Sequence, residues 1–69
     1  MKIKVNGKEK YLDTNEKQIT LTETINSLGY LPNTIVVELN NLIVNYEAWA
    51  TESVEDGDIL EIVSIVGGG

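Results

Sequence analysis

The sequence predicts an α+β fold in which a mixed sheet of four to five strands packs against one main helix. Three features support this prediction: a hairpin pattern at the start, a capped amphipathic helix over residues 20–29, and an apolar strand over residues 59–66. A hairpin, a crossing helix and a central C-terminal strand together make a β-grasp. The length of 69 residues suits one core. We therefore expect one domain at residues 1–66 and a flexible glycine tail at residues 67–69.

The chain opens with a pattern typical of a β-hairpin. Ile3 and Val5 alternate with polar residues, which is the period of a half-buried strand. Asn6-Gly7 follows, and both residue types tolerate the positive φ angles of a type I′ turn. Residues 8–13 are therefore expected to form the return strand, with Tyr11 as its apolar anchor.

A short helix is expected to begin after Thr20. Thr20 and Glu23 have the spacing of a capping box, in which each side chain accepts a hydrogen bond from the other residue's backbone amide. Gly29 suits the left-handed position that ends a helix. One face of this segment is apolar (Leu21, Ile25 and Leu28). So short a helix is not stable alone, so the apolar face is expected to lie on the sheet.

Further strands are expected in the second half of the chain. Residues 34–39 are apolar and β-branched, and Asn40-Asn41 suits a tight turn into a strand at residues 42–45. The segment that follows carries Tyr46 and Trp49, and we expect both rings to pack as a satellite of the core. The last strand is apolar on both faces apart from one Glu and one Ser, which is typical of a strand with neighbours on both sides.

The composition argues against an enzyme. The sequence has no Cys and no His, so the usual zinc ligands, a thiol nucleophile and an imidazole base are missing. A chain this short also has little room to enclose a cleft. We therefore expect a carrier that is a co-substrate of partner enzymes, with no catalytic residue, no metal and no bound cofactor.

The charge and the hydropathy exclude two classes of partner. Eleven acidic and five basic residues give a formal charge of −6, and such a surface repels the phosphates of nucleic acids. The charge favours a basic protein surface, or it serves solubility alone. No apolar run approaches the roughly 20 residues that span a bilayer, and the alternating first residues are unlike a secretion signal. We expect a cytoplasmic protein that contacts no membrane.

The sequence closes on Gly67, Gly68 and Gly69, directly after an apolar strand. Three glycines add nothing to a core, so one interpretation is a frayed end without a function. The other is a carboxylate that enters a narrow active site of another protein, where side chains would clash. An ATP-using partner would activate that carboxylate as an acyl-adenylate, and a sulfur nucleophile would leave a thiocarboxylate on Gly69. Both interpretations stay open on the residues alone.

The chain also carries a series of short segments in a specific order: Ile3–Gly7, Thr20–Ile25, Tyr46–Trp49 and Asp56–Val63, before the Val-Gly-Gly-Gly end. In this order, and over essentially the whole length, they resemble the ThiS family of sulfur carriers in thiamine biosynthesis. The resemblance implies a ubiquitin-like β-grasp and a cycle with several partners. An E1-like adenylating enzyme would activate Gly69 with ATP while Gly67 and Gly68 thread into its active site. A sulfurtransferase system would supply sulfur, and the thiocarboxylate would deliver it to thiazole synthase.

The last strand is expected to use its two faces differently. Leu60 and Ile62 should face the helix, whereas Glu61, Val63 and Ile65 should lie on the opposite face of the sheet. An apolar patch there suits a partner surface, and the resemblance implies docking on the activating enzyme through it. A second buried layer or a homodimer is the alternative.

Acidic residues gather around the last turn (Glu52, Glu55, Asp56, Asp58 and Glu61). They either dock a basic partner or form a solvated loop, and we favour the loop for Glu52 and Glu55.

Other functions fit the same sequence. The chain could carry sulfur for molybdopterin or for tRNA thiolation, although its compact opening argues against the molybdopterin type. It could also be a ubiquitin-like modifier or an interaction module. Removal of Gly68 and Gly69 separates these classes, because a carrier loses its function and a binding module keeps its affinity.

Overall fold

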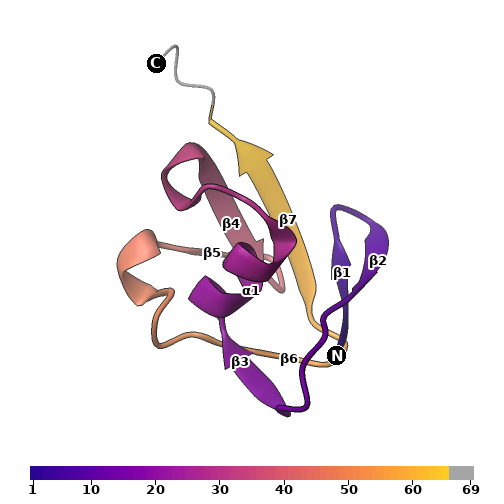
Figure 1. Cartoon of the computed structure of the whole chain (residues 1–69). Helices are drawn as coiled ribbons and strands as arrows, with labels where there is room; N and C mark the ends of the chain where they lie inside the picture. Colours follow the sequence, from indigo (N-terminus) through magenta and orange to yellow (C-terminus); the bar gives the residue numbers. More distant parts are fainter. Residues whose placement is uncertain (66–69) are drawn as a thin grey trace.

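The computed structural model describes residues 1–65, in which one α-helix crosses a five-stranded mixed sheet (Figure 1). This arrangement confirms the predicted α+β fold and the predicted number of strands in the mixed sheet. In chain order the elements are β1 (Lys2–Val5), β2 (Lys8–Tyr11), β3 (Gln18–Thr20), α1 (Leu21–Leu28), the 3-10 helix η1 (Pro32–Thr34), β4 (Ile35–Leu39), β5 (Leu42–Val44), the 3-10 helix η2 (Tyr46–Ala48), β6 (Ser53–Glu55) and β7 (Ile59–Ser64).

The main sheet has the strand order β2-β1-β7-β4-β5, which places the last strand at its centre as predicted. Strand β7 runs parallel to β1, with Leu60 beside Val5, and antiparallel to β4, with Ile62 beside Val37. Strands β3 and β6 form a separate two-stranded sheet. The sequence did not predict this small sheet, because each of its strands has three residues within a polar stretch.

Two tight turns join neighbouring strands of the main sheet, and both confirm the sequence prediction. Asn6 has a φ of 51° and Gly7 a φ of 83° between β1 and β2. Asn40 and Asn41 have φ values of 51° and 73° between β4 and β5. Asn and Gly are the residues that adopt this left-handed region most readily, which explains their place in the turns.

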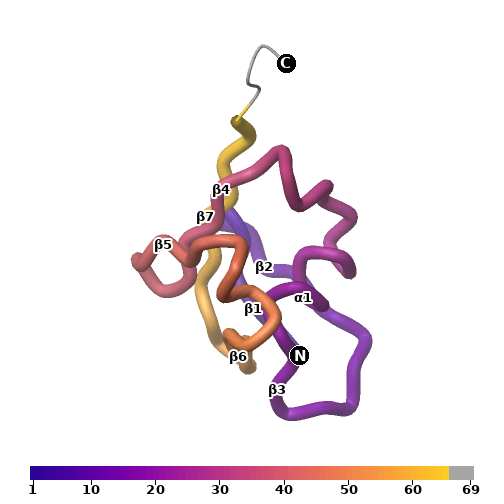
Figure 2. The backbone as a smooth tube through the Cα atoms, turned by 90° about the vertical axis from the view of Figure 1, so that its left-hand side faces the viewer, coloured from indigo at the N-terminus to yellow at the C-terminus, as the bar shows by residue number. Residues whose placement is uncertain are grey.

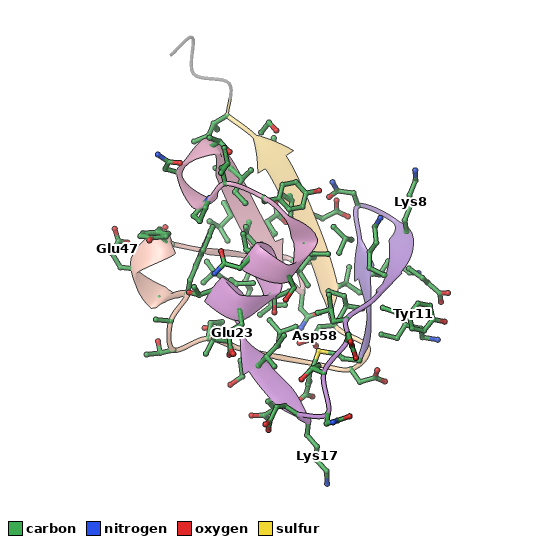
Figure 3. All side chains as sticks on the ribbon, viewed as in Figure 1. Lys8, Tyr11, Lys17, Glu23, Glu47 and Asp58 are labelled. Carbon is green, nitrogen blue, oxygen red and sulfur yellow. The ribbon has the colours of Figure 1, made fainter. Side chains whose placement is uncertain are left out.

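The expected role of Tyr11 as the anchor of the return strand is wrong. Strand β2 ends at Tyr11, whose side chain is 74% exposed and points outward in Figure 3. Its register partner is Lys2, so both residues lie on the sheet face opposite the core. The next residue, Leu12, is buried instead. Its N–H donates to the Met1 carbonyl at 2.7 Å, and the Met1 amino group donates back to the Leu12 carbonyl at 3.1 Å.

Helix α1 begins and ends as predicted. The Thr20 hydroxyl accepts from the Glu23 N–H at 3.1 Å, and the Glu23 carboxylate accepts from the Thr20 N–H at 2.9 Å. Gly29 ends the helix with a φ of 85°. The N–H of Leu21 donates to the Glu52 carbonyl at 2.8 Å, so a loop before β6 satisfies a donor that the first turn leaves unpaired.

The core lies between α1 and one face of the main sheet. Figure 2 shows the helix on one side and strands β4, β5 and β7 on the other. The buried apolar residues are Ile3, Val5, Leu12, Leu21, Ile25, Ile35, Val37, Leu39, Trp49, Val54, Leu60 and Ile62. Burial of this set supplies the main driving force for folding, because the chain contains no Cys and therefore no disulfide. Among residues 1–65, no helix has the length and the apolar character that crossing a membrane requires.

The two aromatic residues near η2 differ in burial. Trp49 is 2% exposed, and its indole N–H donates to the Val44 carbonyl at 2.8 Å. Tyr46 is 62% exposed, so the prediction that it packs as a satellite of the core is wrong. Its ring meets the edge of the Trp49 ring at a centroid distance of 5.1 Å. Tyr46 therefore covers the tryptophan from outside.

Candidate functional site

The described chain ends at the edge of the sheet where β7 stops. Strand β7 ends at Ser64, and the Ile65 N–H donates to the Thr34 carbonyl at 2.8 Å. The pairing of β7 with the β4 side of the sheet thus extends through Ile65, next to η1. The expected tail residues Gly67, Gly68 and Gly69 lie outside the described residues, as does Val66.

The two faces of β7 divide as the sequence predicted. Leu60 and Ile62 are buried in the core that α1 covers. Val63 is 59% exposed and Ile65 is 51% exposed, and Glu61 is exposed as well. Because side chains of a strand alternate between faces, these three residues lie on the face turned away from the helix. In the described chain this face is open, and no second layer covers it.

Neighbouring strands extend this open face. The register pairs Val63 with Val36 and Glu61 with Glu38 on β4, and Glu38 in turn with Ile43 on β5. We call these residues and Ile65 the outer patch: Val36, Glu38, Ile43, Glu61, Val63 and Ile65. From the sequence, only Glu61, Val63 and Ile65 were expected on this face. The alternation of residues 35–39 could have predicted the β4 members as well. Val36 and Glu38 alternate with the buried residues of β4 and therefore lie on its other face.

Two carboxylates stand side by side at the centre of the outer patch. Glu38 and Glu61 are direct register partners across the antiparallel pair of β4 and β7, a relation that brings Cβ atoms to about 4.5–5.5 Å. Glu38 is half-buried and Glu61 is exposed. In the described part of the chain, the ion pair joins Lys2 Nζ to Glu9 Oε2 at 3.6 Å, on β1 and β2. The two glutamates are therefore not neutralised by a lysine of residues 1–65.

Two of the five acidic residues around the last turn, Asp56 and Asp58, have a structural role. The Asp58 carboxylate accepts from the Glu55 N–H at 2.9 Å and from the Asn40 side-chain amide at 3.1 Å. The Asp56 carboxylate accepts from the Lys2 N–H at 2.7 Å. These contacts hold the turn before β7 against the neighbouring strands. Within residues 1–65, no group of three or more acidic side chains is arranged to hold a metal ion.

A model of the ThiS family matches residues 3–69, which is nearly the entire chain. The chain belongs to the ThiS family. A crystal structure of the thiamine biosynthesis protein ThiS from Geobacter metallireducens is 33% identical, with a TM-score of 0.84 and full coverage of both chains. A solution structure of a thiamine biosynthesis protein from the same organism is 34% identical, with a TM-score of 0.80, and covers 100% of this chain and 88% of that one. The predicted ubiquitin-like β-grasp is thus confirmed as the ThiS type.

Two curated proteins are similar to this ThiS-family chain. The uncharacterized protein ycf40 of Trieres chinensis is 38% identical over 65 residues, which are 94% of this chain and 85% of that protein. A thiazole synthase of Paramagnetospirillum magneticum is 36% identical over 69 residues. That match covers all of this chain and only 20% of the synthase, so the segment similar to this chain is a small part of a longer protein.

Proposed function

We propose that this chain is a sulfur carrier of thiamine biosynthesis that works through a thiocarboxylate on Gly69. The match of the ThiS family model through residue 69 is the observation that carries the proposal. A second observation supports it: a thiazole synthase contains a segment similar to the whole of this chain. Sulfur delivered to a thiazole synthase would enter the thiazole half of thiamine.

The chemistry begins with an unreactive carboxylate. An E1-like adenylating enzyme joins the Gly69 carboxylate to the α-phosphate of ATP, so that pyrophosphate leaves and an acyl-adenylate forms. Hydrosulfide, or its equivalent from a sulfurtransferase system, then attacks the acyl carbon, and AMP leaves with the bonding electron pair. The product is a thiocarboxylate whose sulfur is nucleophilic. After the sulfur bonds to the acceptor, the acyl C–S bond breaks, and water adds to the acyl carbon to restore the carboxylate.

The chain contributes a substrate group and a docking surface to these steps, and ATP binds to the partner. Gly67 and Gly68 carry no side chain that would block a narrow channel. The absence of Cys leaves no internal thiol to compete for the activated carbonyl. Glu61, Val63 and Ile65 belong to the open face of the sheet, close to the point where the described chain ends. This face would rest on the partner. We place this carrier in the cytoplasm, acting without a cofactor, a membrane or a nucleic acid.

Intact-protein mass spectrometry tests the proposal. The chain is incubated with the adenylating enzyme of its own genome, ATP and a sulfide source. We expect a mass gain equal to the replacement of one oxygen by one sulfur, and no gain when Gly69 is deleted. Glu47→Gln, a substitution of an exposed residue on η2, is the control and should gain the same mass as the wild type. An unmodified mass in the complete mixture would rule out the carrier function and favour an interaction module.

A further inference from the structure

We infer that the outer patch is covered by a partner surface that is apolar at its rim and carries an arginine or lysine at its centre, opposite Glu38 and Glu61. This inference rests on the proposed function and specifies the surface of the adenylating enzyme that receives the carrier. It concerns the two central carboxylates, which the tail chemistry does not use.

The rim of the patch has the character of a contact surface. Ile43 is 65% exposed, and Val63 and Ile65 are also more than half exposed. Together with Val36 they flank the two glutamates along β4 and β7 and on the β5 side. A rigid sheet presents these side chains at fixed positions, so a partner can cover them with little loss of conformational entropy.

The charge at the centre identifies the chemistry of the partner. Glu38 and Glu61 are like charges directly opposite each other, an arrangement that destabilises an isolated sheet. Lys4 lies on the same face, diagonal to Glu61 across β1 and β7, yet within residues 1–65 it forms no ion pair with either glutamate. A guanidinium or ammonium group placed between the carboxylates would offset their repulsion and donate charge-assisted hydrogen bonds to both. An apolar or an acidic surface offers no such donor. The binding energy is therefore gained only with a basic partner.

The same charge argues against a second copy of this chain as the occupant. A symmetric dimer through the outer patch would place the glutamate pairs of two copies in one interface. The formal charge of each copy is −6, which adds long-range repulsion. A basic surface gains from both features, because the overall charge speeds the encounter and the central pair fixes the register.

Neutralising Glu38 or Glu61 should raise the stability of the free carrier and lower its affinity for the partner. These opposite effects separate a docking role from a structural one. Glu38→Gln and Glu61→Gln each neutralise one of the two charges and so remove their mutual repulsion, and the melting temperature of the free carrier should rise by about 2 °C. The same variants should bind the adenylating enzyme about tenfold more weakly, and the double variant more weakly still. Their affinity should also depend less on salt concentration than that of the wild type. Glu47→Gln, which changes the net charge equally on η2 (Figure 3), is the matched control.

Isothermal titration calorimetry of the full chain with its adenylating enzyme, at low and high salt, gives these affinities. Weaker binding and a flatter salt dependence in the patch variants, with wild-type behaviour in Glu47→Gln, support the inference. Unchanged affinity in the double variant overturns it, as does an equal loss in the control or the absence of binding by the wild type. Self-association of the wild type through this face in sedimentation runs also overturns it. The sulfur gain on Gly69 is measured separately by mass, so the docking inference and the carrier function can fail independently.

Discussion

The side-chain amide of Asn6 is hydrogen-bonded to both backbone groups of Ile62, 56 positions further along the chain. Its Oδ1 accepts from the Ile62 N–H at 2.7 Å, and its Nδ2 donates to the Ile62 carbonyl at 3.1 Å. Strand β1 ends at Val5, so this side chain continues the contact with β7 where the first strand has turned away. One residue thus shapes the first turn and fixes the central strand directly before Val63.

Replacing Asn6 should separate these two roles. Asn6→Gly keeps the positive φ of 51° accessible and loses both side-chain hydrogen bonds, at a cost of about 1–2 kcal/mol in the free energy of unfolding. Asn6→Ala also has to adopt a left-handed conformation, which adds about 1–2 kcal/mol. Urea denaturation measures both values. Equal losses in the two variants would mean that the backbone conformation costs nothing here.

The capping box at the start of α1 gives a second test. Thr20→Ala removes the hydroxyl that accepts from the Glu23 N–H, and we expect a loss of about 1 kcal/mol in unfolding free energy. Thr20→Ser keeps the oxygen and should remain close to the wild type. Hydrogen exchange at the Glu23 amide checks the mechanism, because it should accelerate in the alanine variant and not in the serine variant.

The end of the same helix depends on the conformation of Gly29 and not on space around it. A Cβ added at Gly29 would meet no atom within 4 Å, but the φ of 85° is unfavourable for a residue with a side chain. We expect Gly29→Ala to cost about 1–2 kcal/mol. Gly29→Asn should cost less, since Asn tolerates this region better. Thermal unfolding of the two variants tests the order, and a larger loss with Asn would contradict it.

The sequence was most informative where a local pattern and the tertiary structure demand the same residue. The turns at Asn6-Gly7 and Asn40-Asn41, the capping box and Gly29 are of this kind, because backbone angles and hydrogen bonds act within a few residues. The alternation of Leu60 and Ile62 with exposed residues also followed from the period of a strand. These features predicted the fold and the β7 part of the candidate site.

Contacts between distant segments were not predictable in the same way. The double hydrogen bond from Asn6 to Ile62 and the bond from the Asn40 side chain to Asp58 depend on how the strands are paired. The pairing of Glu38 with Glu61 likewise needs the register of β4 on β7. Tyr11 was expected to be the apolar anchor of the return strand, yet the adjacent Leu12 is buried instead. Periodicity within one strand does not show which of two adjacent apolar residues the core selects.

The two faces of β7 should respond differently to substitution. Leu60 is fully buried, so Leu60→Ala should lower the free energy of unfolding by about 2–5 kcal/mol. Val63→Thr keeps a β-branched side chain on an exposed position, and its unfolding free energy should change by less than about 0.5 kcal/mol. The same variant should bind the adenylating enzyme more weakly, because it places a hydroxyl in the apolar rim of the outer patch.

Leu42→Thr is the matched control for this prediction. Leu42 is 72% exposed on β5, but its register partner is the buried Leu39. Leu42 therefore lies on the face of the sheet that carries the core, and outside the outer patch. Its replacement should leave the affinity unchanged. Chemical denaturation and calorimetric titration of the three variants give both quantities. If Val63→Thr destabilised the chain as much as Leu60→Ala, Val63 would belong to a buried layer. If it bound as the wild type does, docking through this face of β7 would be wrong.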